Sequence, residues 1–243
     1  MIFTTSLSSN IGGRDKNDDY AGYMFKEGSY GAWITADGLG GHVDGDVASR
    51  IAVESSLKAF EENNSLEILN IENIISKANL DIINAQSDHK ASNGMRTTLV
   101  ALFTDSKKVV WAHVGDTRLY YFKNGSLSAR TKDHSVSQLA VSSGDISEDQ
   151  IRFHEDRNKL LRVLGTGPEL KVDVLKQPLQ VEAGDAFLLC TDGFWEYVYE
   201  AEMEIDFSKA ASPQQWVSFM IERLYMRIPP GNDNFTAVAV FVE

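Results

Sequence analysis

Acidic residues stand at the ends of five segments whose apolar character predicts β-strands. They are Asp18 and Asp19, Asp37, Asp116, Asp192 and Asp233. Asp-Gly and Asp-Asn pairs are common turn formers, so each position taken alone indicates a turn. Buried strands would nevertheless bring these ends together, where two carboxylates repel by about 4 kcal/mol at about 4 Å and an effective dielectric constant of about 20. A divalent cation would remove that repulsion, and ligands that are all oxygen favour Mg²⁺ or Mn²⁺ over Zn²⁺.

A glycine-rich stretch follows one of these acids, in the order Asp37-Gly38-Leu39-Gly40-Gly41-His42. Glycine lets the backbone approach a ligand closely and leaves the Gly38 carbonyl free to bind a metal ion. No Lys-Ser or Lys-Thr pair follows, so the stretch is not a nucleotide-type phosphate loop. We interpret it as a turn that supplies metal ligands.

The single cysteine, Cys190, lies in an apolar run. A cysteine phosphatase needs an arginine at the end of a Cys-x5-Arg loop, and Glu196 holds that position. We therefore interpret Cys190 as a core residue. One cysteine allows no internal disulfide and suits a reducing compartment, so we expect a cytoplasmic protein.

The net charge of −12, from 35 acidic and 23 basic residues, narrows the range of partners. It would repel a phosphate backbone, so nucleic acid is not an expected partner. The longest apolar run, Ala237 to Val242, is far shorter than the roughly 20 residues of a membrane-spanning helix. The first residues show no basic segment followed by an apolar one, so no signal peptide is expected. We expect one domain over residues 1–243, a monomer without membrane association.

Hydrophobic periodicity predicts the elements that must position the acids. Apolar residues recur at three- and four-residue steps over 48–59 and 71–85, which predicts two helices. A third is predicted after Ser212, because Ser212-Pro213-Gln214-Gln215 has the pattern of a capping box with proline at the first helical position. An Asn124-Gly125 pair predicts a hairpin turn. Strands are predicted at Tyr20–Phe25, Tyr30–Ala36, Thr98–Phe103, Val109–Val114, Leu119–Phe122, Val172–Leu175, Asp185–Thr191 and Phe235–Val242. Strands that are apolar on both faces need cover on both sides, so these elements predict a layered α+β domain.

Seven segments share an order along the chain: Arg14–Asp19, Ala36–Ser49, Gly94–Thr98, Val114–Arg118, Asp133–Ser135, Cys190–Trp195 and Asp233–Thr236. Together they resemble the motifs of the metal-dependent serine/threonine protein phosphatases, the protein phosphatase 2C family, in its bacterial form. One such motif would carry little weight, whereas seven in the family's order are highly specific. The resemblance extends over nearly the whole chain.

The resemblance implies a four-layer α-β-β-α sandwich, in which two antiparallel sheets are flanked by helix pairs and a metal cleft lies at the strand ends. It also implies that a polar segment at about 135–158 forms a flap over this cleft. The few apolar residues of the segment predict that it is mobile and selects substrates rather than performing chemistry.

The resemblance also implies two Mn²⁺ or Mg²⁺ ions, with Asp37 bridging both. The other ligands would form two sets, Asp192 and Asp233 for one ion, and Asp19, Asp18 and the Gly38 carbonyl for the other, mostly through water. A water activated by both ions would then attack phosphorus in line.

Two further residues are implied to act on the substrate. Arg14 offers a bidentate fork to the phosphate. His42 is a candidate general acid for the leaving group, and a metal-bound water is the alternative.

Departures from the family's pattern concern a possible third ion. Glu196 stands where many members carry a second aspartate after Asp192, so an ion at Asp116 should be weakly held. Arg96 replaces a usual glycine and Thr117 a common serine. Every core carboxylate position is filled, which argues against an inactive relative.

These patterns lead to the hypothesis of an enzyme that hydrolyses phosphoserine and phosphothreonine in proteins. Its partners would be phosphorylated targets of a bacterial Ser/Thr kinase that it opposes. A second hypothesis is a hydrolase of small phosphates or a two-metal nuclease, the nuclease being disfavoured by the net charge. A third is a catalytically weak module that binds phosphoproteins. Metal-dependent turnover separates the third hypothesis from the first two.

Overall fold

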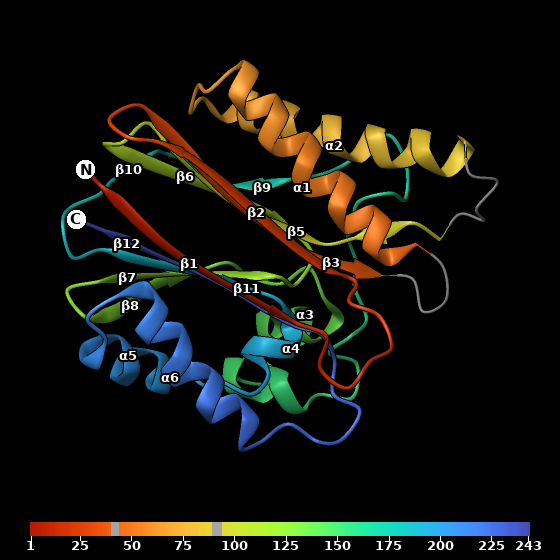
Figure 1. The fold of residues 1–243 in the computed structure, drawn as a ribbon. Coiled ribbons are helices and arrows are strands. Elements are labelled where there is room, and N and C mark those ends of the chain that lie inside the picture. Colours follow the sequence, from red (N-terminus) through yellow and green to blue (C-terminus); the bar gives the residue numbers. More distant parts are fainter. Residues whose placement is uncertain (40–43, 89–93) are drawn as a thin grey trace.

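The computed structural model describes residues 1–39, 44–88 and 94–243. Two antiparallel sheets lie face to face at its centre (Figure 1). Helices α1 (Gly45–Glu62) and α2 (Ile68–Asp88) cover the outer face of one sheet, and α5 (Glu200–Lys209) and α6 (Pro213–Tyr225) cover the other. The four-layer α-β-β-α sandwich is confirmed.

Both sheets are built from antiparallel pairs. Their strand orders place strands that are distant in sequence side by side. The first sheet has the order β1-β12-β11-β7-β8. Its strands are β1 (Phe3–Asn10), β12 (Phe235–Val242), β11 (Ala186–Cys190), β7 (Arg118–Lys123) and β8 (Ser126–Arg130). The second has the order β10-β6-β5-β3-β2, with β4 pairing β3 and β9 pairing β6. Its strands are β10 (Leu179–Gln180), β6 (Lys108–Val114), β5 (Leu99–Thr104), β3 (Tyr30–Leu39), β2 (Asp19–Lys26), β4 (Arg96–Thr97) and β9 (Asp173–Val174).

Apolar side chains fill the space between the two sheets. Phe3 of β1 packs against Trp33 of β3, with ring centroids 5.3 Å apart. The Trp33 indole also donates a hydrogen bond to Thr5 Oγ1 at 2.8 Å, which satisfies its only polar atom. One further apolar layer lies between each sheet and the helices that cover it. The strand ends at the cleft are therefore fixed by a core that continues through all four layers.

The three helices predicted from periodicity are confirmed as α1, α2 and α6. The Ser212 hydroxyl accepts the backbone N–H of Gln215 at 3.2 Å, as the capping pattern predicts. The Gln215 side chain, however, accepts from the backbone N–H of Ala211 and not from that of Ser212. Within the described part of the chain, no helix combines the length and apolar character needed to cross a membrane.

Strand β1 was not predicted, because its residues are mostly polar and do not alternate. It forms the edge of its sheet and pairs with β12 along its whole length, from Phe3 opposite Val242 to Asn10 opposite Phe235. Tertiary pairing outweighs the weak local pattern here.

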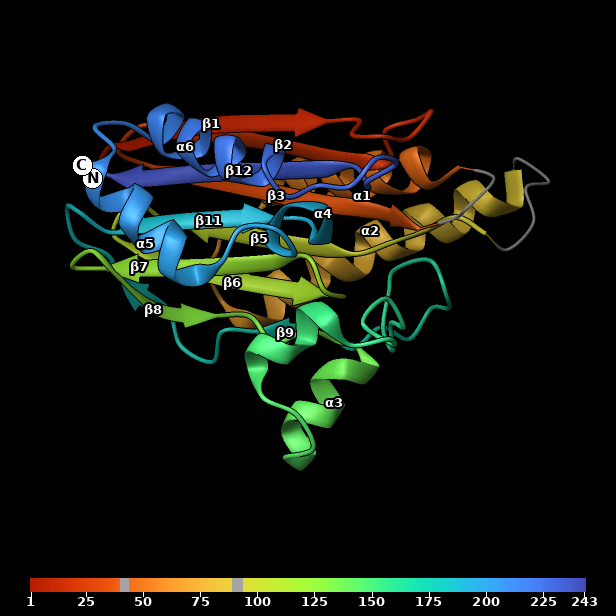
Figure 2. The same ribbon diagram turned by 90° about the horizontal axis from the view of Figure 1, so that it is seen from below.

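The flap segment contains regular structure that the sequence analysis did not predict. Helix α3 (Val136–Ser143) begins at a Ser135 cap and ends at Gly144 with φ 85°, and the 3₁₀ helix η1 spans Glu148–Phe153. In Figure 2, α3 and η1 extend beyond the edge of the sheets. Ile151 is buried against the core, so the middle of the segment is anchored. Mobility of the segment stays a prediction.

The hairpin between β7 and β8 gives a test of backbone strain. Asn124 and Gly125 have φ of 52° and 82°, and no atom lies within 4 Å of where a Gly125 Cβ would be. Gly125→Ala should therefore lower the free energy of unfolding by about 1 kcal/mol through backbone strain alone. Urea denaturation measures this change. Gly167→Ala is the matched control, because its Cβ also meets open space but its φ is not positive. Equal effects of both variants would contradict this account.

Candidate active site

The acidic residues singled out in the sequence converge where the two sheets meet. Asp19 at the start of β2 lies opposite Asp37 in the register of β2 with β3. Asp192 is the first residue of the short helix α4 (Asp192–Trp195), which follows β11. Asp233 lies two residues before β12, and Asp116 two residues after β6. Both sheets thus contribute carboxylates to one end of the sandwich.

A cleft of about 570 Å³ opens at this end. Its lining includes most of the predicted site residues, Asn158 at the end of the flap, and Leu160 just after the flap. The lining residues are Arg14, Asp15, Lys16, Asp18, Asp37, Gly38, Leu39, Asp44, Gly45, Asp116, Asn158, Leu160, Asp192, Asp233 and Asn234. Asp19 is buried and does not line the cleft.

Burial and mutual repulsion raise the pKa of the innermost carboxyls. The pKa of Asp192 rises to about 7, first because burial disfavours the charged form and then because Glu196 and Asp233 repel it. Burial raises the pKa of Asp19 to about 8, although hydrogen bonds from Thr236 and Thr191 oppose the shift. Burial, followed by the charge of Asp192, raises the pKa of Asp37 and of Asp116 well above the ordinary range. Full ionisation of the cluster is therefore unfavourable unless a cation neutralises it.

The donor set fits hard divalent cations. All of the converging side-chain donors are carboxylate oxygens, the ligands preferred by Mg²⁺ and Mn²⁺. Asp18 Oδ1 is buried and has no hydrogen-bond partner among the described residues. A Cβ added at Gly45 would lie 3.0 Å from the Gly38 carbonyl oxygen and 3.2 Å from Asp18 Oδ2. Both oxygens therefore border the same small space, which an alanine at position 45 would fill.

The backbone that carries Asp37 is held by two threonines. Thr97 Oγ1 donates to the Asp37 carbonyl at 2.7 Å, and Thr98 Oγ1 accepts the Asp37 N–H at 3.0 Å. The next residue must be glycine, because a Cβ at Gly38 would lie 2.2 Å from the Gly45 carbonyl oxygen. These contacts position Asp37 and the Gly38 carbonyl together. The sequence analysis did not assign this supporting role to Thr97 or Thr98.

Asparagine and threonine side chains position the remaining acids. Asn234 Oδ1 accepts the Asp18 N–H at 2.8 Å, and its amide donates to the carbonyls of Ile11 and Lys16. Thr191 Oγ1 donates to Asp19 Oδ2 at 2.8 Å. Both residues follow or precede an acid in sequence, but their partners lie far away in the chain, so only the fold shows these roles.

Arg14 lies at the mouth of the cleft. Its Nη2 donates to Asp233 Oδ2 at 2.9 Å, and its side chain is 54% exposed. This bond uses one of the five guanidinium N–H donors, so the remaining donors can reach a phosphate in the cleft.

Glu196 is engaged by the flap. Arg157 Nε donates to Glu196 Oε1 at 2.6 Å, and the Glu196 side chain is 12% exposed. Asp116 is buried, and Trp195 Nε1 donates to its carbonyl at 3.0 Å. The carboxylate that departs from the family's pattern is therefore paired with an arginine.

Two other predicted residues have different outcomes. His42 lies outside the described residues. Cys190 is fully buried in β11, and burial raises the pKa of its thiol, so the interpretation of a core residue is confirmed.

Comparison with known proteins finds a matching family and several similar phosphatases. A family model described as protein phosphatase 2C matches residues 8–227. The serine/threonine phosphatase stp of Listeria welshimeri is 35% identical over 234 residues, which cover 93% of this chain and 90% of that protein. The serine/threonine phosphatase Stp1 from Staphylococcus aureus has a TM-score of 0.87 and 27% identity, covering 100% of this chain and 96% of that one. The catalytic domain of the phosphatase PstP, solved in complex with 2 manganese ions, has the same fold, with a TM-score of 0.83, 24% identity, and 98% and 97% coverage.

The raised pKa values predict how the stability of the metal-free protein depends on pH. The folded protein retains protons on Asp192 and Asp19 up to pKa values of about 7 and 8, whereas the unfolded chain loses them near pH 4. The folded state therefore binds more protons in this window, and its stability falls as pH rises from about 4 to about 8. Urea denaturation in a chelator at stepped pH measures the slope.

Asp192→Asn removes one of these titrations and should make the slope shallower. Glu169→Gln, which replaces an exposed carboxylate outside the cleft, is the control and should leave it unchanged. A metal-free protein whose stability rises between pH 4 and 8 would show that the cluster is not strained by its own charge.

Proposed function

The chain belongs to the protein phosphatase 2C family and is a serine/threonine phosphatase, and from this premise we propose a metal-dependent mechanism in the acidic cleft. Its substrates are phosphorylated proteins. The observation that supports the mechanism is the convergence of Asp37, Asp192, Asp233 and Asp18 around one cleft with Arg14 at its mouth.

The carboxylates would divide between two ions as follows. Asp37 would serve both, because the charges of Asp192 and Asp19 act on the Asp37 carboxyl more strongly than those of Asp116 and Asp233. Asp192 and Asp233 would complete one set. Asp19, Asp18 and the Gly38 carbonyl would form the other set, and oxygens of Asp18 and Gly38 border the space beside Gly45. When bound, Mn²⁺ or Mg²⁺ would lower the pKa of water and neutralise charge on the phosphoryl oxygens.

The protein's own groups would hold the substrate and shape the cleft. Arg14 would donate to two phosphate oxygens while Asp233 fixes its orientation. The leaving serine or threonine oxygen needs a proton, for which His42 or water is the donor. Asn158 at the end of the flap lines the cleft, as does Leu160 just after it, which supports a role of the flap in substrate selection.

We also propose that the protein acts as a monomer on targets of a Ser/Thr kinase. Asp116 would hold a third ion weakly, because Glu196 is paired with Arg157.

Turnover assays test the proposed mechanism. Asp37→Asn and Asp192→Asn should abolish Mn²⁺-dependent hydrolysis of a phosphothreonine peptide and of p-nitrophenyl phosphate while the far-UV spectrum stays unchanged. Glu169→Gln should retain full activity. Near-normal turnover by either aspartate variant would refute the two-metal mechanism. Faster turnover of nucleotides or DNA than of phosphopeptide would instead favour the alternative hydrolases.

Arg14 can be tested separately from the metal ligands. Arg14→Ala should lower kcat/KM for the phosphopeptide by about 10–100-fold, the scale of a lost charge-assisted hydrogen bond of about 1.5–3 kcal/mol. Arg14→Lys keeps the charge but loses the fork, so it should recover only part of the activity. Steady-state kinetics measure both. If Arg14→Ala matches the unchanged protein, Arg14 belongs to the surface alone.

A further inference from the structure

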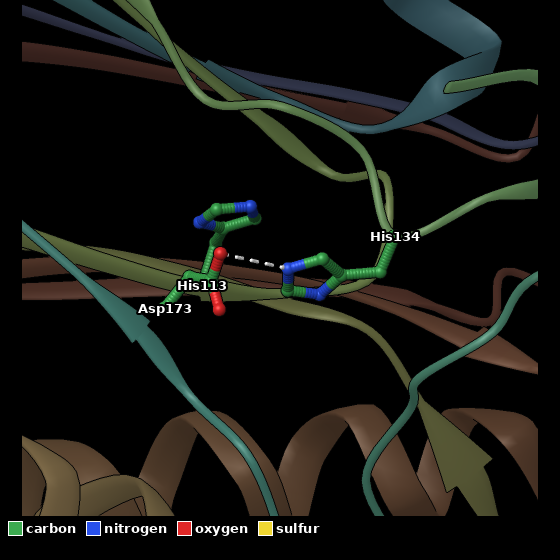
Figure 3. Close-up of side chains that lie close together, drawn as sticks. All are labelled: His113, His134 and Asp173. Atoms are coloured by element: carbon green, nitrogen blue, oxygen red, sulfur yellow. Dashed lines mark ion pairs between the residues drawn. The ribbon is translucent and has the colours of Figure 1, made fainter. Parts of the chain in front are cut away.

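Two buried histidines and an aspartate lie together beside the cleft but do not line it. The rings of His113 on β6 and His134 stack with centroids 4.6 Å apart and an interplanar angle of 18°. The Nε2 atom of His134 lies 3.4 Å from Asp173 Oδ2. Figure 3 shows the two side chains facing each other, with this contact as a dashed line. Nothing in the proposed reaction uses this group.

Hydrogen bonds fix the proton on the His134 ring. Nδ1 accepts the backbone N–H of Gly115 at 3.1 Å, so Nδ1 carries no proton. The neutral ring must then carry its proton on Nε2, facing Asp173, so Arg162 Nη1, 3.2 Å from Nε2, is a close contact and not a donor to the ring. Burial lowers the pKa of His134 to about 4, with further lowering by the charges of His113 and Arg162, which keeps the ring neutral.

This arrangement does not suit a metal ion, although the three side chains are close enough to hold one. A metal on Nε2 would force the proton to Nδ1, where it would face the Gly115 N–H. The guanidinium of Arg162 also lies 3.2 Å from Nε2 and donates to Asp173 at 2.8 Å. A cation is thus already present where the ion would bind.

The partner of His134 is the corner that carries Asp116. Gly115 has φ 105°, and a Cβ there would lie 2.6 Å from the Thr98 side chain. The His134 backbone N–H donates to the Gly115 carbonyl at 2.9 Å, so His134 binds both polar groups of Gly115. We propose that His134 is a positioning residue whose Nδ1 sets the Gly115–Asp116 corner for the phosphatase reaction.

His134 also connects this corner to residues 161–162, which follow the flap. Leu161 donates its backbone N–H to the His134 carbonyl at 2.7 Å, and Asp173 binds Arg162. Asp116 is therefore positioned by a chain of contacts that begins at residues 161–162. The inference rests on the proposed function, because Asp116 is assigned there to the cleft chemistry.

Two conservative substitutions separate the contacts of the ring. His134→Asn places an oxygen where Nδ1 lies and keeps the acceptor for Gly115, whereas His134→Gln reaches Asp173 but loses that acceptor. With a phosphopeptide, His134→Asn should keep kcat within about 3-fold. His134→Gln and His134→Leu should lower kcat by about 10–100-fold with KM unchanged, the scale for lost support of a site residue. Equal kcat values for the Asn and Gln variants would overturn the assignment.

Nuclear magnetic resonance of the metal-free protein provides a test that does not depend on activity. In the unchanged protein, ¹⁵N spectra should show His134 protonated on Nε2 and not on Nδ1. Hydrogen exchange at the Gly115 amide should be slow there and in His134→Asn, and faster in His134→Gln. A proton on Nδ1, or a shift of the ring nitrogens on adding Zn²⁺, would overturn the assignment even if the phosphatase mechanism held. If Asp37→Asn or Asp192→Asn kept near-normal turnover while these spectra were as expected, only the two-metal mechanism would be contradicted.

Discussion

Mutual repulsion among buried carboxylates is the constraint on which the rest of this structure depends. Asp19, Asp37, Asp116 and Asp192 are all brought out of water near one another, and each is made less acidic by the transfer. Loose ends of strands would move apart to relieve this. The two sheets prevent it, because their shared apolar core and full pairing leave the strand ends no freedom to separate.

The groups that support the acids are mostly neutral hydrogen bonders. Thr98, Thr191 and Asn234 fix backbones or carboxylates without adding countercharge inside the cluster. Arg14 pairs with Asp233 at the mouth of the cleft, whereas the fully buried Arg118 pairs with Asp133 and stacks over the Trp195 ring at 3.4 Å. Trp195 in turn binds the Asp116 carbonyl. Neutral hydrogen bonds thus fix the innermost acids, whose charge a bound cation would neutralise.

Much of the fold and of the acidic cluster could be predicted from the sequence, because apolar periodicity and strand-end acids are local patterns. The hairpin at Asn124-Gly125 and the Ser212 cap were predicted for the same reason. Strand β1 was not, since it depends on pairing with β12 at the other end of the chain. Helix α3 was not either, although its Ser135 cap and its Gly144 end are local signals, because the polar composition of its segment favoured a flap without regular structure. The relation of Asp18 to Gly45 was likewise hidden, because it arises only where β2, β3 and the start of α1 meet.

The Arg157–Glu196 pair has a consequence for how this domain can diverge. Glu196 lies beside Asp192 and Asp233 with its side chain only 12% exposed, so without Arg157 it would add an uncompensated charge to a cluster whose carboxylates repel one another. The two positions come from different segments, one in the flap and one in helix-capping backbone after α4. If the flap were replaced by that of a relative with aspartate at position 196, Glu196 of this chain would lose its Arg157 partner. The replacement would therefore also require the relative's aspartate at position 196. Arg157 in the flap and Glu196 beside the cleft therefore have to be exchanged together.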